Sequence, residues 1–129
     1  MQGKAHSDSQ CRIAVSSLGR TLNSKVGPLA RCPYIFVFEG SPENYRVVES
    51  RPKGEAHERG PSAAQTLAKL NVGTVITGTI GPRAYKVLES AGIHVKGGCT
   101  GTVSSAVKKC AAGKLEDCKG ATFAGHLSI

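Results

Sequence analysis

The sequence predicts a single-domain α/β protein with a mixed five-stranded sheet flanked by three helices. First, short apolar runs rich in β-branched residues alternate with segments of helical spacing over residues 60–113, which is the pattern of a parallel sheet. Second, the apolar runs at 34–39 and 45–50 are joined by a turn at 40–44, which indicates an antiparallel hairpin. Third, the length of 129 residues is usual for one domain.

The first half of the chain supplies the antiparallel part of this sheet. Residues 11–16, CRIAVS, are expected to form a short strand that is buried on both faces after Arg12. Residues 17–31 are expected to form a loop, and loops of this length are often functional. After the hairpin, residues 51–60 are polar and are expected to be a mobile loop.

The second half supplies the parallel strands and the helices, predicted at 72–77 (strand), 82–91 (helix), 93–96 (strand) and 102–113 (helix). The helix before them has Pro61 at its first position and ends at Asn71 or Gly73. Gly92, followed by an apolar residue, indicates a Schellman-type end for the next helix. Thr102 is expected to cap the last one.

Composition narrows the classes of function. The net charge of +8 favours an anionic partner, either nucleic acid or an anionic small ligand or cluster. No apolar run approaches the roughly 20 residues of a membrane helix. Residues 1–10 lack the apolar centre of a signal peptide, so we expect a disordered leader, a domain at 11–117, a tail at 118–129 and a cytoplasmic protein.

The first candidate site is the glycine turn 77–81. A glycine turn that feeds a helix N-terminus presents backbone N–H groups to an anion, and Gly78, Thr79 and Gly81 stand there. Pro82 removes one donor, and the alternative is a tight turn that binds nothing. The chain has neither GxxxxGK[ST] nor a GxGxxG motif, so a nucleotide site is weakly indicated.

The second candidate is the turn 97–101, where Gly98, Cys99, Thr100 and Gly101 precede the last helix. A thiol at a helix N-terminus is biased toward the thiolate that binds metal or attacks carbon, although a small buried cysteine is a common alternative. The chain has five cysteines and no CxxC pair, so neither a disulfide framework nor a zinc ribbon is indicated.

Two further loops carry candidate ligands. Cys32 follows Arg31 at the mouth of the first hairpin strand, and His57 lies near Arg59 in a polar stretch. Burial is the common state of such a cysteine, and a solvated loop histidine is the alternative for His57.

Other residue types carry little chemistry. The carboxylates form no recognisable acid pair. Tyr34, Phe36 and Phe38 alternate along one strand, where a core face is more expected than a base-stacking face. Nucleic-acid binding therefore rests mainly on charge.

Several segments occur together in a telling order: IAVSS, then RCPYIFVF, then GPSAAQTLAKLNVGTVITGTIGPRAYKVLESAGIHVKGGCTGTVSSAV, then GKLED. The landmarks VITGxIGPxAxxVL, AGIxV and GxTGTVxxAV within them are far more specific than a lone glycine motif. By these segments, over roughly residues 12–117, the chain resembles the dinitrogenase iron–molybdenum cofactor biosynthesis family.

The resemblance implies a ribonuclease H-like fold without nuclease activity, in a protein that is not an enzyme. Members bind or carry molybdenum- or iron-containing sulfide clusters or their precursors. In size the chain is similar to the subgroup of orange proteins of sulfate-reducing bacteria, which hold a molybdenum–copper sulfide cluster non-covalently. The implied partners are the cluster and an acceptor or ATPase protein, with no membrane and with nucleic acid disfavoured.

From these observations we expect an anionic metal–sulfide cluster, of molybdenum–copper or iron–molybdenum type, as the cofactor. The expected direct metal ligands are Cys32, His57 and Cys99. The expected cluster-binding residues are Arg31, Arg59, Gly78, Thr79, Gly81, Gly98, Thr100 and Gly101. Many family members carry Phe-Gly where this chain has Leu29-Ala30. The alternatives are a basic nucleic-acid or nucleotide-binding module and, third, an enzyme with Cys99 as nucleophile.

Overall fold

The computed structural model describes residues 12–50 and 56–115, with side chains from residue 59 onward in the second segment. The strands are β1 (Arg12–Ser17), β2 (Tyr34–Glu39), β3 (Tyr45–Glu49), β4 (Thr74–Ile76) and β5 (His94–Lys96). The helices are the short 3-10 helix η1 (Leu29–Arg31) and the α-helices α2 (Ala56–Lys69), α3 (Pro82–Ser90) and α4 (Val103–Ala111). The expected leader at 1–10 and tail at 118–129 lie outside the described residues.

The five strands form one mixed sheet in the order β3-β2-β1-β4-β5. β1 pairs in parallel with β4, and β4 with β5, while β2 is antiparallel to β1 and β3. The predicted mixed five-stranded sheet is therefore confirmed. β4 is shorter than the predicted 72–77, since Val72, Gly73 and Thr77 lie outside it. The carbonyl of Thr77 accepts a hydrogen bond from the backbone N–H of Cys99 at 3.1 Å.

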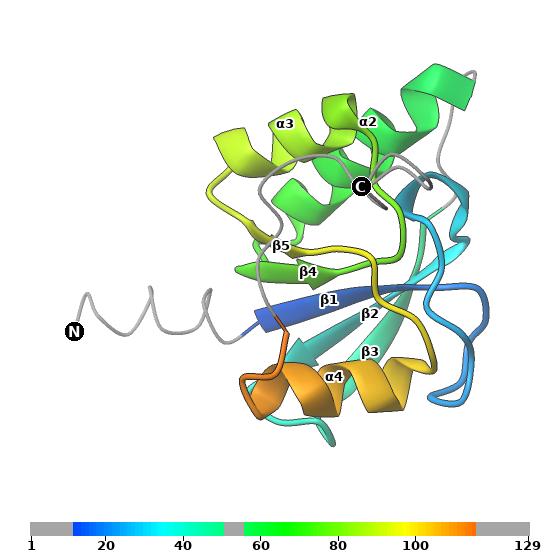
Figure 1. Cartoon of the computed structure of the whole chain (residues 1–129), viewed down its shortest axis with the longest axis vertical. Helices are drawn as coiled ribbons and strands as arrows, with labels where there is room; N and C mark the ends of the chain where they lie inside the picture. Colours follow the sequence, from blue (N-terminus) through cyan, green and yellow to red (C-terminus); the bar gives the residue numbers. More distant parts are fainter. Residues whose placement is uncertain (1–11, 51–55, 116–129) are drawn as a thin grey trace, which may run out of the picture.

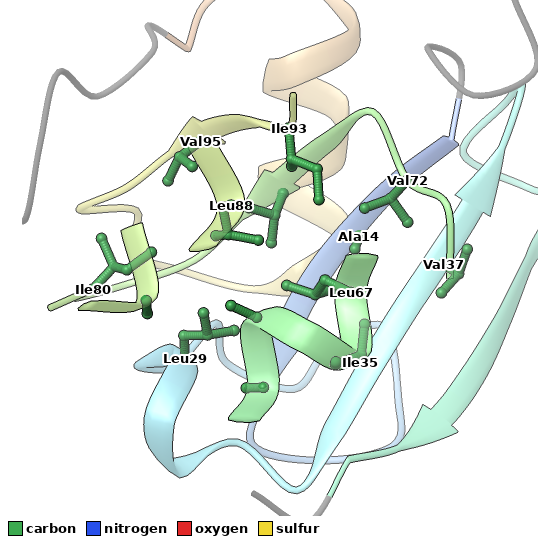
Figure 2. Close-up of a cluster of buried hydrophobic side chains, with 14 residues drawn as sticks. Ala14, Leu29, Ile35, Val37, Leu67, Val72, Ile80, Leu88, Ile93 and Val95 are labelled. Atoms are coloured by element: carbon green, nitrogen blue, oxygen red, sulfur yellow. The ribbon is translucent and has the colours of Figure 1, made fainter. Parts of the chain in front are cut away.

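Helices cover both faces of the sheet, as the alternating pattern predicts (Figure 1). α2 and α3 lie over one face, and α4 lies over the other. Figure 2 shows the core under α2 and α3, where Ala14, Ile35 and Val37 of the sheet meet Leu67 and Leu88 of the helices. All five side chains are at most 1% exposed.

The core under α4 contains the two phenylalanine side chains of β2. Phe36 and Phe38 stack with ring centroids 6.0 Å apart and are essentially inaccessible. Val103 and Val107 of α4 pack in the same cluster. The expectation of a core face on β2 is confirmed, and neither phenylalanine ring is available to stack on a base.

The local stop and start signals act as predicted. Asn71 adopts a left-handed conformation with φ 61° after α2. Gly92 has φ 76°, and the N–H of Ile93 donates to the carbonyl of Leu88 at 3.0 Å, which is the longer bond of a Schellman motif. The side chain of Thr102 accepts a hydrogen bond from a backbone N–H in the first turn of α4 at 3.1 Å.

The start of α2 differs from the prediction. We predicted a loop over 51–60 and a helix that begins at Gly60-Pro61, but α2 begins at Ala56 and holds Pro61 inside it. Alanine, glutamate and arginine before Gly60 are strong helix formers. Gly60 has no Cβ to meet the following proline ring, which removes much of the usual obstacle to a helical residue before proline.

No helix within the described residues is both long and apolar enough to cross a membrane.

Candidate anion-binding site

The loops that follow the parallel strands meet at one edge of the sheet. The backbone N–H of Gly78 donates to the carbonyl of Gly27 at 3.0 Å, and that of Gly98 donates to the carbonyl of Gly78 at 2.6 Å. The early loop, the turn after β4 and the turn after β5 are therefore joined by hydrogen bonds. A parallel strand-helix-strand unit gathers its loops at one edge of the sheet, so the sequence predicts that both glycine turns lie there, and these contacts confirm it.

These hydrogen bonds use backbone N–H groups of the glycine turns that the sequence pattern predicts would bind a ligand. The N–H groups of Gly78 and Gly98 are both bonded within the protein, so neither points to a ligand in this conformation. Gly78 is crowded as well, because a Cβ there would lie 3.2 Å from the backbone carbonyl carbon of Gly27. Gly78 therefore allows two backbone segments to approach closely, which is a recurrent use of glycine.

A cavity of about 530 Å³, which we call the arginine pocket, opens beside this junction. It is lined by residues 28–31 around η1, residues 59–61 of α2, and residues 79–84 of the turn before α3 and its first turn. The predicted residues Arg31, Arg59, Thr79 and Gly81 all line it. The volume falls in the range of typical ligand sites.

The rim of the arginine pocket is positively charged. Arg31, Arg59 and Arg83 come from three different elements, and all three side chains are exposed. No lining residue of this pocket is a carboxylate. Guanidinium groups stay charged and hydrogen-bond to anions through a fixed fork of donors, so the pocket suits an anion.

Arg83 is the pocket residue that sequence reasoning missed. It follows Pro82 in the first turn of α3, where a cation opposes the helix dipole. An arginine in this unfavourable position, directly after the glycine turn, is the sequence signal that could have indicated a binding residue.

The floor of the arginine pocket is apolar. Leu29, Ile80 and Ala84 are 1–2% exposed and belong to the core under α2 and α3. Figure 2 shows Leu29 and Ile80 at the same end of that core. The absence of a side chain at Gly60 allows α2 to approach α3 closely. A Cβ at this position would lie only 3.2 Å from the Cβ of Ala84.

A second, smaller cavity of about 220 Å³, the lysine pocket, holds the other predicted turn. It is lined by residues 97–100, by Ala106 and Lys109 of α4, and by residues 114–115. Cys99 contacts the core under α4, and its Sγ lies 3.4 Å from the carbonyl oxygen of Lys96. The predicted site is thus divided: Gly98, Cys99 and Thr100 line the lysine pocket, and Gly101 lines neither pocket.

Cys32 lies inside the protein. It is 1% exposed, and burial raises the pKa of its thiol from 9.0 to about 11, although hydrogen bonds with Ser16 and with the backbone of Gly27 lower it. A protonated, enclosed thiol is a poor metal ligand.

Cys32 belongs to a buried polar group that holds the early loop to the sheet. Ser16 Oγ lies 2.8 Å from the carbonyl oxygen of Gly27 and 2.7 Å from Thr77 Oγ1. The group ties the ends of β1 and β4 to the loop segment before η1, and it therefore helps to place one wall of the arginine pocket.

The three expected metal ligands are not seen together. His57 lies in the first turn of α2, but its side chain is outside the described part. Among the side chains that are described, no group of three histidine, cysteine, aspartate or glutamate residues could hold a metal ion. Cys32 is buried and Cys99 lines the lysine pocket, so the structure does not bring these two expected ligands to one cavity.

Comparison with known proteins gives a consistent result. The solved structure of the apo form of the orange protein from Desulfovibrio gigas is similar, with a TM-score of 0.80 and 30% identity over 88% of this chain and 98% of that one. A NifB-like protein from Thermotoga has a TM-score of 0.74 and 30% identity, over 90% of this chain and 100% of that one. An uncharacterized protein of Methanocaldococcus jannaschii is 30% identical over 98 residues, covering 73% of this chain and 83% of that protein.

The family model described as "dinitrogenase iron-molybdenum cofactor" matches residues 10–113. That match spans every described strand and helix. The chain therefore belongs to the dinitrogenase iron–molybdenum cofactor family.

Proposed function

We propose that the protein binds or carries an anionic metal–sulfide cluster, of molybdenum–copper or iron–molybdenum type, non-covalently in the arginine pocket. The observation that carries this proposal is the placement of Arg31, Arg59 and Arg83 around one cavity of about 530 Å³. Family membership points to a cofactor-related role. The net charge of +8 adds attraction for an anion at longer range.

A preformed cluster fits the arginine pocket better than a bare metal ion does. Guanidinium groups carry no acceptor and stay protonated, so they do not coordinate a metal. A cluster that brings its own sulfide ligands needs only charge, shape and hydrogen bonds from the protein. The protein then acts as a binder or carrier without catalysis.

Direct metal bonds from Cys99 or His57 remain a separate part of the proposal. Cys99 lines the lysine pocket with Lys109 and Lys114, so a bond from its sulfur requires cargo in that pocket. Cys32 is the least suitable of the three, because it is enclosed and protonated at neutral pH.

The test is reconstitution with tetrathiomolybdate and copper, followed by a visible spectrum and elemental analysis after gel filtration. Arg31→Ala and Arg83→Ala should each lower the affinity for the cluster by about tenfold or more, since one charge-assisted hydrogen bond contributes about 1.5–3 kcal/mol. Arg46→Ala is the matched control. It removes the same charge from β3, where Arg46 lies 4.0 Å from Glu39 outside the pocket.

Two results would refute the proposal. One is the absence of charge-transfer bands and of retained metal in the wild-type protein. The other is equal loss of affinity in Arg46→Ala and in the pocket variants, which would mean that only overall charge matters.

The alternative is a basic nucleic-acid or nucleotide-binding module without catalysis. The specific observation in its favour is the lysine pocket, where Lys109 and Lys114 border a glycine-rich turn. The burial of Phe36 and Phe38 argues against this alternative, because neither ring can stack on a base. Retarded migration of RNA or DNA probes at moderate salt would support this alternative.

The proposal also includes the wider setting of the protein. It places the cluster in a cytoplasmic carrier that passes it to an acceptor or ATPase protein. The ribonuclease H-like classification of the sheet likewise stays a prediction.

A further inference from the structure

We infer that the lysine pocket is a second anion-binding site of this protein, suited to one small oxoanion such as inorganic phosphate. The inference goes beyond the proposed function, because it concerns a different cavity and a different ligand. The arginine pocket is lined by residues of α2 and α3 on one face of the sheet, whereas the lysine pocket lies beside α4 on the other face (Figure 1). Either site can therefore be filled while the other is empty.

Two lysines from successive segments give the lysine pocket its positive charge. Lys109 belongs to the last turn of α4, Lys114 follows the end of that helix, and both side chains are exposed. An ammonium group carries three donors and no acceptor, and no lining residue within the described part of the chain is a carboxylate. A cation in the last turn also suits the helix dipole, which accounts for Lys108 and Lys109 alike but not for Lys114.

Hydrogen bonds hold the segment that carries Lys114 in place. Its backbone N–H donates to the carbonyl of Lys109 at 2.9 Å. The Nζ of Lys96, in β5, donates to the carbonyl of Leu115 at 3.1 Å, which ties the same segment to the sheet. The pocket is therefore formed before a ligand arrives, and binding needs little reorganisation.

The turn 97–100 forms another wall of the lysine pocket. It is fixed by the hydrogen bonds that the backbone N–H groups of Gly98 and Cys99 donate to the segment after β4. Thr100 lines the pocket with a hydroxyl group, and its backbone N–H has no hydrogen-bond partner among the described residues. The N–H groups of Val103 and Ser104, at the start of α4, donate to carbonyl groups of the early loop. The donors left for a ligand therefore belong to the two lysines and to Thr100.

The size and the donors of the lysine pocket indicate the class of ligand. Its volume of about 220 Å³ lies below the range of pockets for drug-sized ligands, so it suits one small group and not a whole nucleoside. Its donors come from Lys109, Lys114 and Thr100. An anion with several acceptor oxygens can bond to more than one of them at once, whereas a chloride ion offers a single atom.

The test is a titration of the isotopically labelled protein with sodium phosphate at low ionic strength, followed by two-dimensional amide NMR spectra. The amide resonances of Cys99 and Thr100 should shift saturably with phosphate, and not with sodium chloride at matched ionic strength. Lys109→Gln and Lys114→Gln should each weaken the affinity for phosphate about threefold to fivefold, the upper part of the range for an exposed ion pair. Lys108→Gln is the matched control, because Lys108 is also exposed in the last turn of α4 but does not line the pocket.

A second measurement uses the thiol that lines the pocket. Bound phosphate should slow the alkylation of Cys99 by iodoacetamide, as measured by mass spectrometry of the peptides, because Cys99 lines the cavity. Cys110 is the internal control, since it is partly exposed and lies outside the pocket. Its rate of alkylation should not change with phosphate.

The inference is overturned if the resonances of Cys99 and Thr100 show no saturable shift, or shift equally with chloride. It is also overturned if Lys108→Gln weakens binding as much as the pocket variants, because only overall charge would then matter. Shifts confined to Thr79 and Ala84 would place phosphate in the arginine pocket and refute a second site, as would a rate of Cys99 alkylation that phosphate leaves unchanged. The reconstitution test decides cluster binding separately, so the two proposals can fail independently.

Discussion

The contact between α2 and α3 at Gly60 and Ala84 can be tested by a double-mutant cycle. The two residues line the arginine pocket beside Arg59 and Arg83. A Cβ at position 60 would lie 3.2 Å from the Cβ of Ala84, a few tenths of an ångström closer than ordinary van der Waals contact. Gly60→Ala should therefore push the helices apart and disturb the spacing of the two arginines.

The size of the effect follows from three terms. Overpacking costs about 1–3 kcal/mol, and alanine gains at most about 1 kcal/mol over glycine in a helix. The residue precedes Pro61, whose ring adds a further penalty for a Cβ. Gly60→Ala should lower the free energy of unfolding by about 1–2 kcal/mol.

The cycle separates the contact from these local terms. Ala84→Gly alone should cost about 1–2 kcal/mol, from helix propensity and from the loss of a buried methyl group. The double variant Gly60→Ala/Ala84→Gly should be more stable than additivity predicts by about 1 kcal/mol. Urea denaturation of the four proteins gives the coupling energy, and Ala68→Gly gives the propensity cost at an exposed position of α2.

A coupling energy within about 0.5 kcal/mol of zero would refute the close approach. In that case α2 and α3 do not touch at this point, and the shape of the pocket between them would be wrong.

Two further predictions concern single side chains. Thr102→Ala should destabilise the protein by about 1 kcal/mol in urea denaturation, because it removes the cap of α4; an unchanged midpoint would contradict the cap. Cys32 holds its proton more tightly in the folded protein, with a pKa of about 11 against 9.0. Its contribution to the free energy of unfolding is fully present below pH 9. As the pH rises through about 11, that contribution, roughly 2–3 kcal/mol, is lost. Urea denaturation of wild type and Cys32→Ala across that range should show this loss only in wild type, and parallel curves would refute it.

The elements of the fold were largely predictable, because their signals are local. The hairpin at 34–50, the left-handed Asn71, the Schellman end at Gly92 and the cap at Thr102 depend on neighbouring residues. The start of α2 was not predictable in this way, because a proline usually marks the start of a helix and Pro61 lies inside this one. The glycine before it decided the outcome.

The candidate site was predictable only in part. Arg31, Arg59, Thr79 and Gly81 do meet in one pocket. The sequence did not show that Gly98, Cys99 and Thr100 open into a different pocket. It also did not show that Cys32 is buried or that Arg83 completes the rim.

The sequence by itself determined the order of strands and helices, the gathering of the glycine turns at one sheet edge and the attraction for an anion. These depend on periodicity, turn chemistry and net charge, which act locally or sum over the chain. Only the tertiary structure decided which loop lines which cavity, because that depends on contacts such as Gly78 N–H with the Gly27 carbonyl, between residues far apart in sequence. The same contacts use the backbone N–H groups of Gly78 and Gly98, and they place beside the junction a cavity with three arginines over an apolar floor, where we propose that the anion binds.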